Sequence, residues 1–95
     1  MKIQPIIVEI LGTFFFLSII LSAVAEPSYG PIAIAAGLLA AIYFGGKISG
    51  GHYNPAVSIM MLAKGNISPI TAIMYIAAQI IGALLALVVN SFIIL

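Results

Sequence analysis

Three apolar runs, each about as long as a bilayer is thick, constrain this chain more than any other feature of its sequence. They cover residues 5–25, 31–48 and 68–92, and only Glu9 and Lys47 carry charge inside them. A helix needs about 20 apolar residues to cross the hydrocarbon core. Charged residues make up 5% of the 95 residues, against about 25% in soluble domains. The sequence therefore predicts an all-α membrane protein with three transmembrane helices.

The composition also excludes several classes of function. The net charge is +1 with no basic run, so we expect no nucleic-acid partner. Cysteine is absent, which removes thiolate nucleophiles and cysteine-based metal sites. His52 has no second ligand nearby in the sequence. We therefore expect no metal, no cofactor and no enzymatic activity.

The segment between the second and third runs predicts a half-helix. Asn54 and Pro55 form an N-cap and first-turn pair, and Gly65 suits a helix stop. The apolar run from Pro55 to position 63 would be roughly 13 Å long, about half of a 30 Å hydrocarbon core. Residues 49–63 are therefore interpreted as a re-entrant loop and half-helix, within a single unit of residues 1–95.

Small residues recur every four positions on the second and third runs. Such a stripe lets helix backbones approach closely, although alanine and glycine are common in membrane helices and the spacing also arises by coincidence. The stripes are Ala33, Gly37, Ala41 and Gly45, and Ala78, Gly82 and Ala86.

Irregular backbone at membrane depth is tolerated only where protein buries it or a watery cavity meets it. The carbonyls of residues 50–53 would line such a cavity, and Asn54 would stand at the positive end of the half-helix dipole. That end repels cations and admits neutral solutes that form hydrogen bonds. The residues alone therefore predict a pore for small neutral molecules.

Residues 49–57, Ser-Gly-Gly-His-Tyr-Asn-Pro-Ala-Val, resemble the first signature loop of the aquaporin and glycerol-facilitator (major intrinsic protein) family. Residues 9–13 and 77–83 are similar to motifs in the first and third helices of that family. Family members have six spans and two half-helices in two inverted repeats, and this chain resembles the N-terminal repeat only. The resemblance implies half of an aquaporin-like fold, with these pore or solute-binding residues: Asn54, Pro55, Ala56, Gly50, Gly51, His52, Tyr53 and Ile34.

Two departures from the family bear on selectivity. Val57 follows the motif, where the second repeat of family members has arginine, and this chain has no arginine. Ile34 occupies the filter position of the first repeat, which is often aromatic in the family. Half of the selectivity filter is therefore missing, and the residues do not define the width of the pore.

The resemblance assigns bracing roles to Glu9 and Gln79. Glu9 would accept hydrogen bonds from backbone N–H groups of the loop; proton-coupled transport and snorkelling to the interface are the alternatives. Gln79 would brace the loop from the other side or form an ordinary interhelical hydrogen bond. Asn54 would orient solute as well as cap the half-helix, and His52 would lie near the inner pore mouth, with pH sensing as an alternative role.

These observations predict a channel component for passive transport of water or small neutral solutes such as glycerol. We expect it to be completed by a second-repeat half or another oligomeric partner. A proton-coupled dimeric exporter that uses Glu9, and a non-conducting fragment or regulatory subunit, are the alternatives. Lys2, Lys47 and Lys64 would all lie on one side, which predicts a cell-membrane protein with the N-terminus cytoplasmic and the C-terminus outside. A signal peptide ending near Ala25 is the rival interpretation of the first span.

Overall fold

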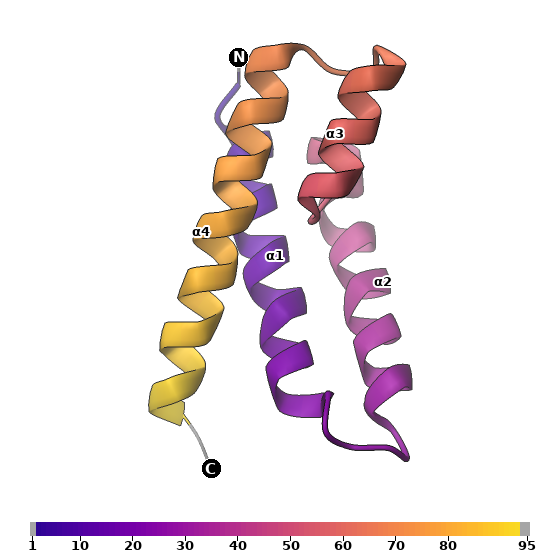
Figure 1. Ribbon diagram of the computed structural model, residues 1–95, viewed down its shortest axis with the longest axis vertical. Coiled ribbons are helices and arrows are strands. Elements are labelled where there is room, and N and C mark those ends of the chain that lie inside the picture. The colour runs from indigo at the N-terminus through magenta and orange to yellow at the C-terminus, as the bar shows by residue number, and fades with distance from the viewer. Residues whose placement is uncertain (1, 94–95) are drawn as a thin grey trace.

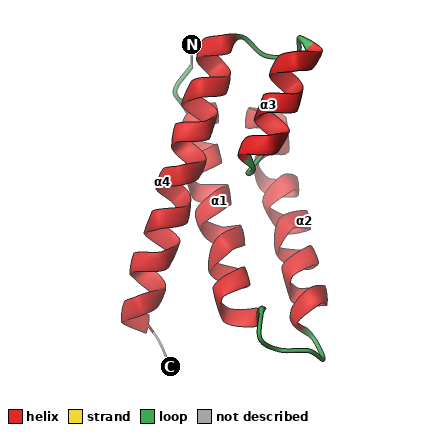
Figure 2. Ribbon diagram, in the orientation of Figure 1, coloured by secondary structure: helices red, strands yellow, loops and turns green. Residues whose placement is uncertain are grey.

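The computed structural model describes residues 2–93, and this part of the chain contains four α-helices and no strand. The helices are α1 (Gln4–Ala23), α2 (Gly30–Ser49), α3 (Pro55–Lys64) and α4 (Pro69–Ile93). Figure 1 shows α1, α2 and α4 running the length of the molecule, with the shorter α3 beside the upper half of α4. The loops that join them are short (Figure 2).

Three of these helices are long and apolar enough to cross a membrane: α1, α2 and α4. At about 1.5 Å per residue, a 20-residue helix reaches about 30 Å, the thickness of the hydrocarbon core. The ten residues of α3 reach only about half of that depth. The predicted fold class, an all-α membrane protein with half of an aquaporin fold, is confirmed.

Proline lies in the first turn of every described helix, where its missing N–H leaves no hydrogen bond unmade. The hydroxyl of Ser68 caps α4 by accepting the Thr71 N–H at 3.2 Å. Glycines in the left-handed conformation end α2 at Gly50 and α3 at Gly65, with φ of 92° and 88°. These local signals explain where the four described helices begin and where α2 and α3 end.

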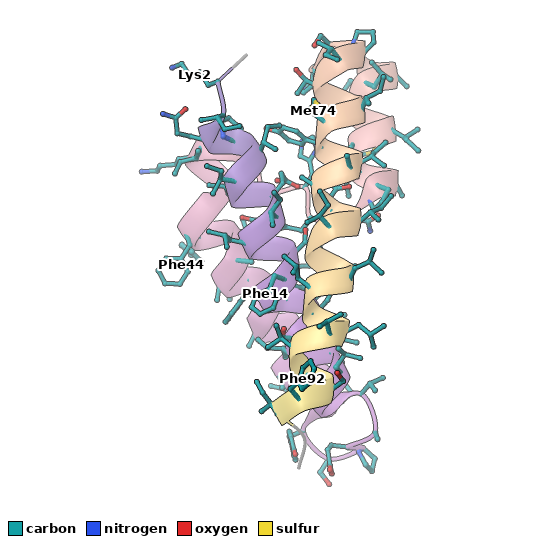
Figure 3. All side chains as sticks on the ribbon, turned by 90° about the vertical axis from the view of Figure 1, so that its left-hand side faces the viewer. Lys2, Phe14, Phe44, Met74 and Phe92 are labelled. Atoms are coloured by element: carbon teal, nitrogen blue, oxygen red, sulfur yellow. The ribbon has the colours of Figure 1, made fainter. Side chains whose placement is uncertain are left out.

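α1 lies between α2 and α4, and α3 packs against α4. The backbones of α2 and α4 do not approach closely within residues 2–93, and the two helices meet where Tyr75 of α4 donates to the carbonyl of Ser49. The end of α3 and the start of α4 therefore lie near the start of α1, while the α1–α2 loop lies at the opposite end with the end of α4 (Figure 1). Apolar side chains cover the outside: Phe44 is 85% exposed and projects away from α2 (Figure 3).

Glycines allow α1 to approach both of its neighbours. A Cβ on Gly82 would lie 2.6 Å from the carbonyl oxygen of Ile10, so α4 meets the backbone of α1 here. A Cβ on Gly37 would lie 2.7 Å from Cδ1 of Ile19. These two positions of the small-residue stripes serve close helix packing, as the spacing predicts.

Replacing Gly82 with alanine should destabilise the α1–α4 pair, because the new Cβ would meet a backbone oxygen that cannot move alone. Overpacking of this kind costs about 1–3 kcal/mol. The expected result is a lower midpoint of thermal unfolding in detergent. Gly46→Ala is the matched control, since its Cβ would meet only Cγ2 of Ile42, at 3.5 Å. Equal midpoints for the two variants would contradict this packing.

Candidate functional site: a re-entrant loop held by a buried carboxylate

The carboxylate of Glu9 lies at the centre of the site and is fully buried, with 0% of the residue exposed. Its Oε1 accepts the N–H of Tyr53 at 2.8 Å and the side-chain amide of Gln79 at 3.0 Å. Its Oε2 accepts the N–H of His52 at 3.0 Å and the hydroxyl of Ser49 at 2.7 Å. All four partners are donors, which is the environment that an ionised carboxylate requires. The position and bonds of Glu9 exclude snorkelling to the interface.

Ser49 and Tyr75 hold the beginning of the loop. The Ser49 hydroxyl oxygen accepts the N–H of Gly51 at 3.1 Å while its proton goes to Glu9. The hydroxyl of Tyr75, on α4, donates to the carbonyl of Ser49 at 2.6 Å. The last residue of α2 is therefore tied to both α1 and α4.

A series of hydrogen bonds also connects Gln79 to the half-helix. The Nε2 group of Gln79 has two hydrogens, and it donates to Ser58 at 2.9 Å as well as to Glu9. Oγ of Ser58 lies 2.8 Å from Nδ1 of His52. The Ser58 hydroxyl oxygen can accept from Gln79 and still either donate to Nδ1 or accept from it, so both ring tautomers of His52 fit this contact. The His52 ring also packs edge-on against Tyr75, with centroids 4.9 Å apart.

Asn54 stands at the N-terminus of α3, at the tip of the half-helix (Figure 1). Its Oδ1 accepts the N–H of Ala56 at 2.8 Å, and its carbonyl accepts the N–H groups of Val57 and Ser58. Asn54 is exposed, and its Nδ2 makes no hydrogen bond within residues 2–93. One side chain therefore caps the helix with its oxygen and leaves an unused donor at the tip.

The structure divides the predicted pore residues into two groups. One group is exposed, whereas His52 and Tyr53 are buried as whole residues, at 7% and 4% exposure. Ile34 is partly buried one turn into α2, at the opposite end of that helix from the loop. The exposed group is Gly50, Asn54, Pro55 and Ala56, and Gly51 is partly buried.

Three residues of the site carried no assignment in the sequence analysis: Ser49, Ser58 and Tyr75. The available signal was a polar side chain inside an apolar helix, which must find a partner away from water. Ser58 is 0% exposed within the otherwise apolar α3. Tyr75 lies one helical turn before Gln79, on the same face of α4.

Two buried polar atoms have no hydrogen-bond partner within the described residues, Oγ1 of Thr13 and Oε1 of Gln79. No cluster of three or more potential metal-ligating side chains occurs between residues 2 and 93. Because Glu9 is already fully used by four donors, the centre of the site is built to hold backbone rather than a cation.

These features define the protein as an integral membrane protein with a re-entrant loop and half-helix, held from within by a buried carboxylate. The sequence pattern of the family described as Major intrinsic protein matches residues 3–94. The chain belongs to the major intrinsic protein family, as its signature loop predicts. No solved structure matches the chain significantly.

Several characterised proteins are similar to the chain. Glycerol uptake facilitator protein-like 6 of Lactiplantibacillus plantarum is 47% identical over 83 residues, which is 82% of this chain and 38% of that protein. Aquaporin Z of Photorhabdus laumondii is 38% identical over 94 residues, 88% of this chain and 41% of the relative. Aquaporin-8 of Notomys alexis is 41% identical over 89 residues, which is 87% of this chain and 34% of that protein. The chain therefore matches only about two fifths of the length of these relatives.

Substitutions at Glu9 should rank in stability as wild type, Glu9→Gln and then Glu9→Leu. Glutamine keeps one acceptor oxygen for two of the four donors, whereas leucine leaves all four unpaired. Each buried unpaired donor costs about 1–3 kcal/mol. Thermal unfolding in detergent measures the ranking, with Glu26→Gln, on the exposed α1–α2 loop, as the control. A Glu9→Leu variant as stable as Glu9→Gln would refute the role of Glu9 as an acceptor.

Proposed function

We propose that this chain is the first-repeat half of a passive channel for water or small neutral solutes such as glycerol. The observation that carries the proposal is the tip of the half-helix, where the amide of Asn54 keeps an unused N–H donor at an exposed position. A membrane helix that only needed a cap would be served equally by aspartate, which has no donor. An amide supplies the cap and a donor for solute at once.

The electrostatics of this tip favour neutral solutes. The N-terminus of α3 carries the positive end of the helix dipole, which raises the energy of a cation there. A water or hydroxyl oxygen would accept from Asn54 while its proton is donated to a carbonyl of Gly50 or Gly51, the exposed and the partly buried residue of the loop. Because Asn54 carries no charge, its hydrogen bond to a neutral solute is weak enough for the solute to leave.

The names of the relatives suggest the class of solute. One is a glycerol uptake facilitator-like protein and two are aquaporins. Because the chain matches about two fifths of their length, we infer that a second repeat completes the pore with a half-helix from the opposite face. In this arrangement the path runs past Asn54 and on toward Ile34, whose aliphatic side chain leaves the filter wider than an aromatic ring would.

Proton-coupled export through Glu9 receives no support from the geometry of the carboxylate. A proton carrier must meet water on one side and then on the other, whereas Glu9 is 0% exposed and is occupied by four donors from the chain itself. The proposed function is therefore conduction without proton coupling and without enzymatic chemistry.

Removal of the Asn54 donor should lower permeability about fivefold, as expected for the loss of one hydrogen bond of about 1 kcal/mol. Asn54→Asp is the sharper variant because aspartate keeps the cap and has no N–H donor. The measurement is stopped-flow shrinkage of vesicles that contain the chain together with the second repeat of a relative such as aquaporin Z. Asn66→Ala, at an exposed position just beyond the far end of α3, is the matched control. Unchanged permeability in Asn54→Asp would refute the pore assignment.

We further propose a cell-membrane orientation with the N-terminus in the cytoplasm, because Lys2, Lys47 and Lys64 all lie toward one end of the bundle. Cysteine labelling tests this cleanly in a chain without native cysteine. In intact cells, an impermeant thiol reagent should label Ser28→Cys and spare Asn66→Cys. Comparable labelling of both would indicate dual topology and would contradict the proposal.

A further inference from the structure

The side chain of Tyr53 occupies a slot between α1 and α2 that only glycines leave open. A Cβ on Gly12 would lie 2.1 Å from Cε1 of Tyr53, and a Cβ on Gly45 would lie 2.1 Å from its hydroxyl oxygen. The hydroxyl donates to the carbonyl of Ala41 at 2.7 Å. The stripe position Gly45 therefore makes room for a side chain of the loop, in addition to its contact with Val8 on α1.

The loop turns sharply at Tyr53, which has a φ of 51°. This left-handed conformation is unfavourable for a residue with a bulky side chain, so the surroundings must hold it in place. Two bonds do so: the N–H of Tyr53 donates to Glu9 at 2.8 Å, and its hydroxyl donates to Ala41 at 2.7 Å. The residue is thereby fixed at both its main chain and its side-chain end, immediately before Asn54.

Packing alone does not fix the ring. A crevice of about 250 Å³ lies beside it on the outer side of the α1–α2 pair. An aromatic ring without the hydroxyl bond would have space to shift into this crevice, and the main chain of the loop would follow. The crevice is lined by apolar side chains of both helices, among them Leu11, Phe15 and Phe44.

We propose that Tyr53 is a positioning residue of the permeation path: its hydroxyl bond to the carbonyl of Ala41 sets the depth of the loop carbonyls and of the Asn54 amide. This inference rests on the proposed function, in which those groups meet the solute. Tyr53 itself touches no solute, since its side chain is only 4% exposed and lies between α1 and α2. Its effect is on geometry, and so on the relative passage of solutes of different size.

The first test measures the position of the loop without conduction. Ala56 is exposed beside Asn54, so the reaction rate of Ala56→Cys with a small thiol reagent reports where the tip of the half-helix lies. Adding Tyr53→Phe, which removes only the hydroxyl, should change that rate threefold or more. Tyr43→Phe is the matched control, because Tyr43 is 81% exposed on the same helix as Ala41.

A second pair of variants perturbs the hydrogen bond between Tyr53 and Ala41 from α2. Gly45→Ala forces the ring away from Ala41, whereas a Cβ on Gly46 would meet only Ile42 at 3.5 Å. Gly45→Ala should therefore reproduce the changed labelling rate of Tyr53→Phe, and Gly46→Ala should not. This pair keeps the test informative if one of the variants folds poorly.

The last measurement is the ratio of water to glycerol permeability in vesicles with the second repeat of aquaporin Z. A threefold or larger change of this ratio in Tyr53→Phe, together with the changed labelling rate, supports the proposal. Loss of folded protein alone would lower both permeabilities equally and leave the ratio unchanged. An unchanged labelling rate overturns it, and so does a changed rate with an unchanged ratio. Failure of the proposed function is recognised separately, by Asn54→Asp that conducts as wild type.

Discussion

The hydrogen bonds of the Glu9 carboxylate are the interaction on which the rest of the structure depends. A carboxylate inside a membrane is costly unless protein donors replace its water. The N–H groups of His52 and Tyr53 face the same problem, since they lie outside any helix at a depth where water is scarce. The Glu9 carboxylate accepts the N–H groups of His52 and Tyr53 at 3.0 and 2.8 Å, so the acceptor and the two donors satisfy each other. The loop can therefore leave helical geometry only because Glu9 is present on α1.

This single carboxylate also joins three helices at one point. Ser49 bonds to it from the end of α2 and Gln79 from α4, and Tyr75 of α4 donates in turn to the carbonyl of Ser49. Gln79 extends the connection to Ser58 in the half-helix. With the loop held from behind in this way, its opposite side and the tip at Asn54 stay free for solute in the function we propose.

The helices of this protein were predictable because a membrane allows few alternatives. Backbone polar groups in lipid must pair within their own segment, so an apolar run of sufficient length becomes a helix. Proline then marks the start of a helix, as Pro69 does for α4, and glycine marks the end of one, as Gly65 does for α3. The acceptor role of Glu9 came from family resemblance. Its donor Ser49 was missed. So were Ser58, which accepts from Gln79, and Tyr75, which donates to the carbonyl of Ser49. The bonds that define them join residues 21 to 40 positions apart, and local patterns carry no information about such pairs.

Hydropathy, segment length and local caps are enough to predict that this chain lies in lipid and has three spans and a half-helix capped by asparagine. Which groups of the loop face inward depends on tertiary contacts. The left-handed turn at Tyr53 sends its ring between Gly12 and Gly45, while Asn54 stays exposed at the tip. Adjacent residues thus face opposite surroundings, since the direction of each side chain depends on the backbone turn and on acceptors supplied by α1 and α2 from distant parts of the chain.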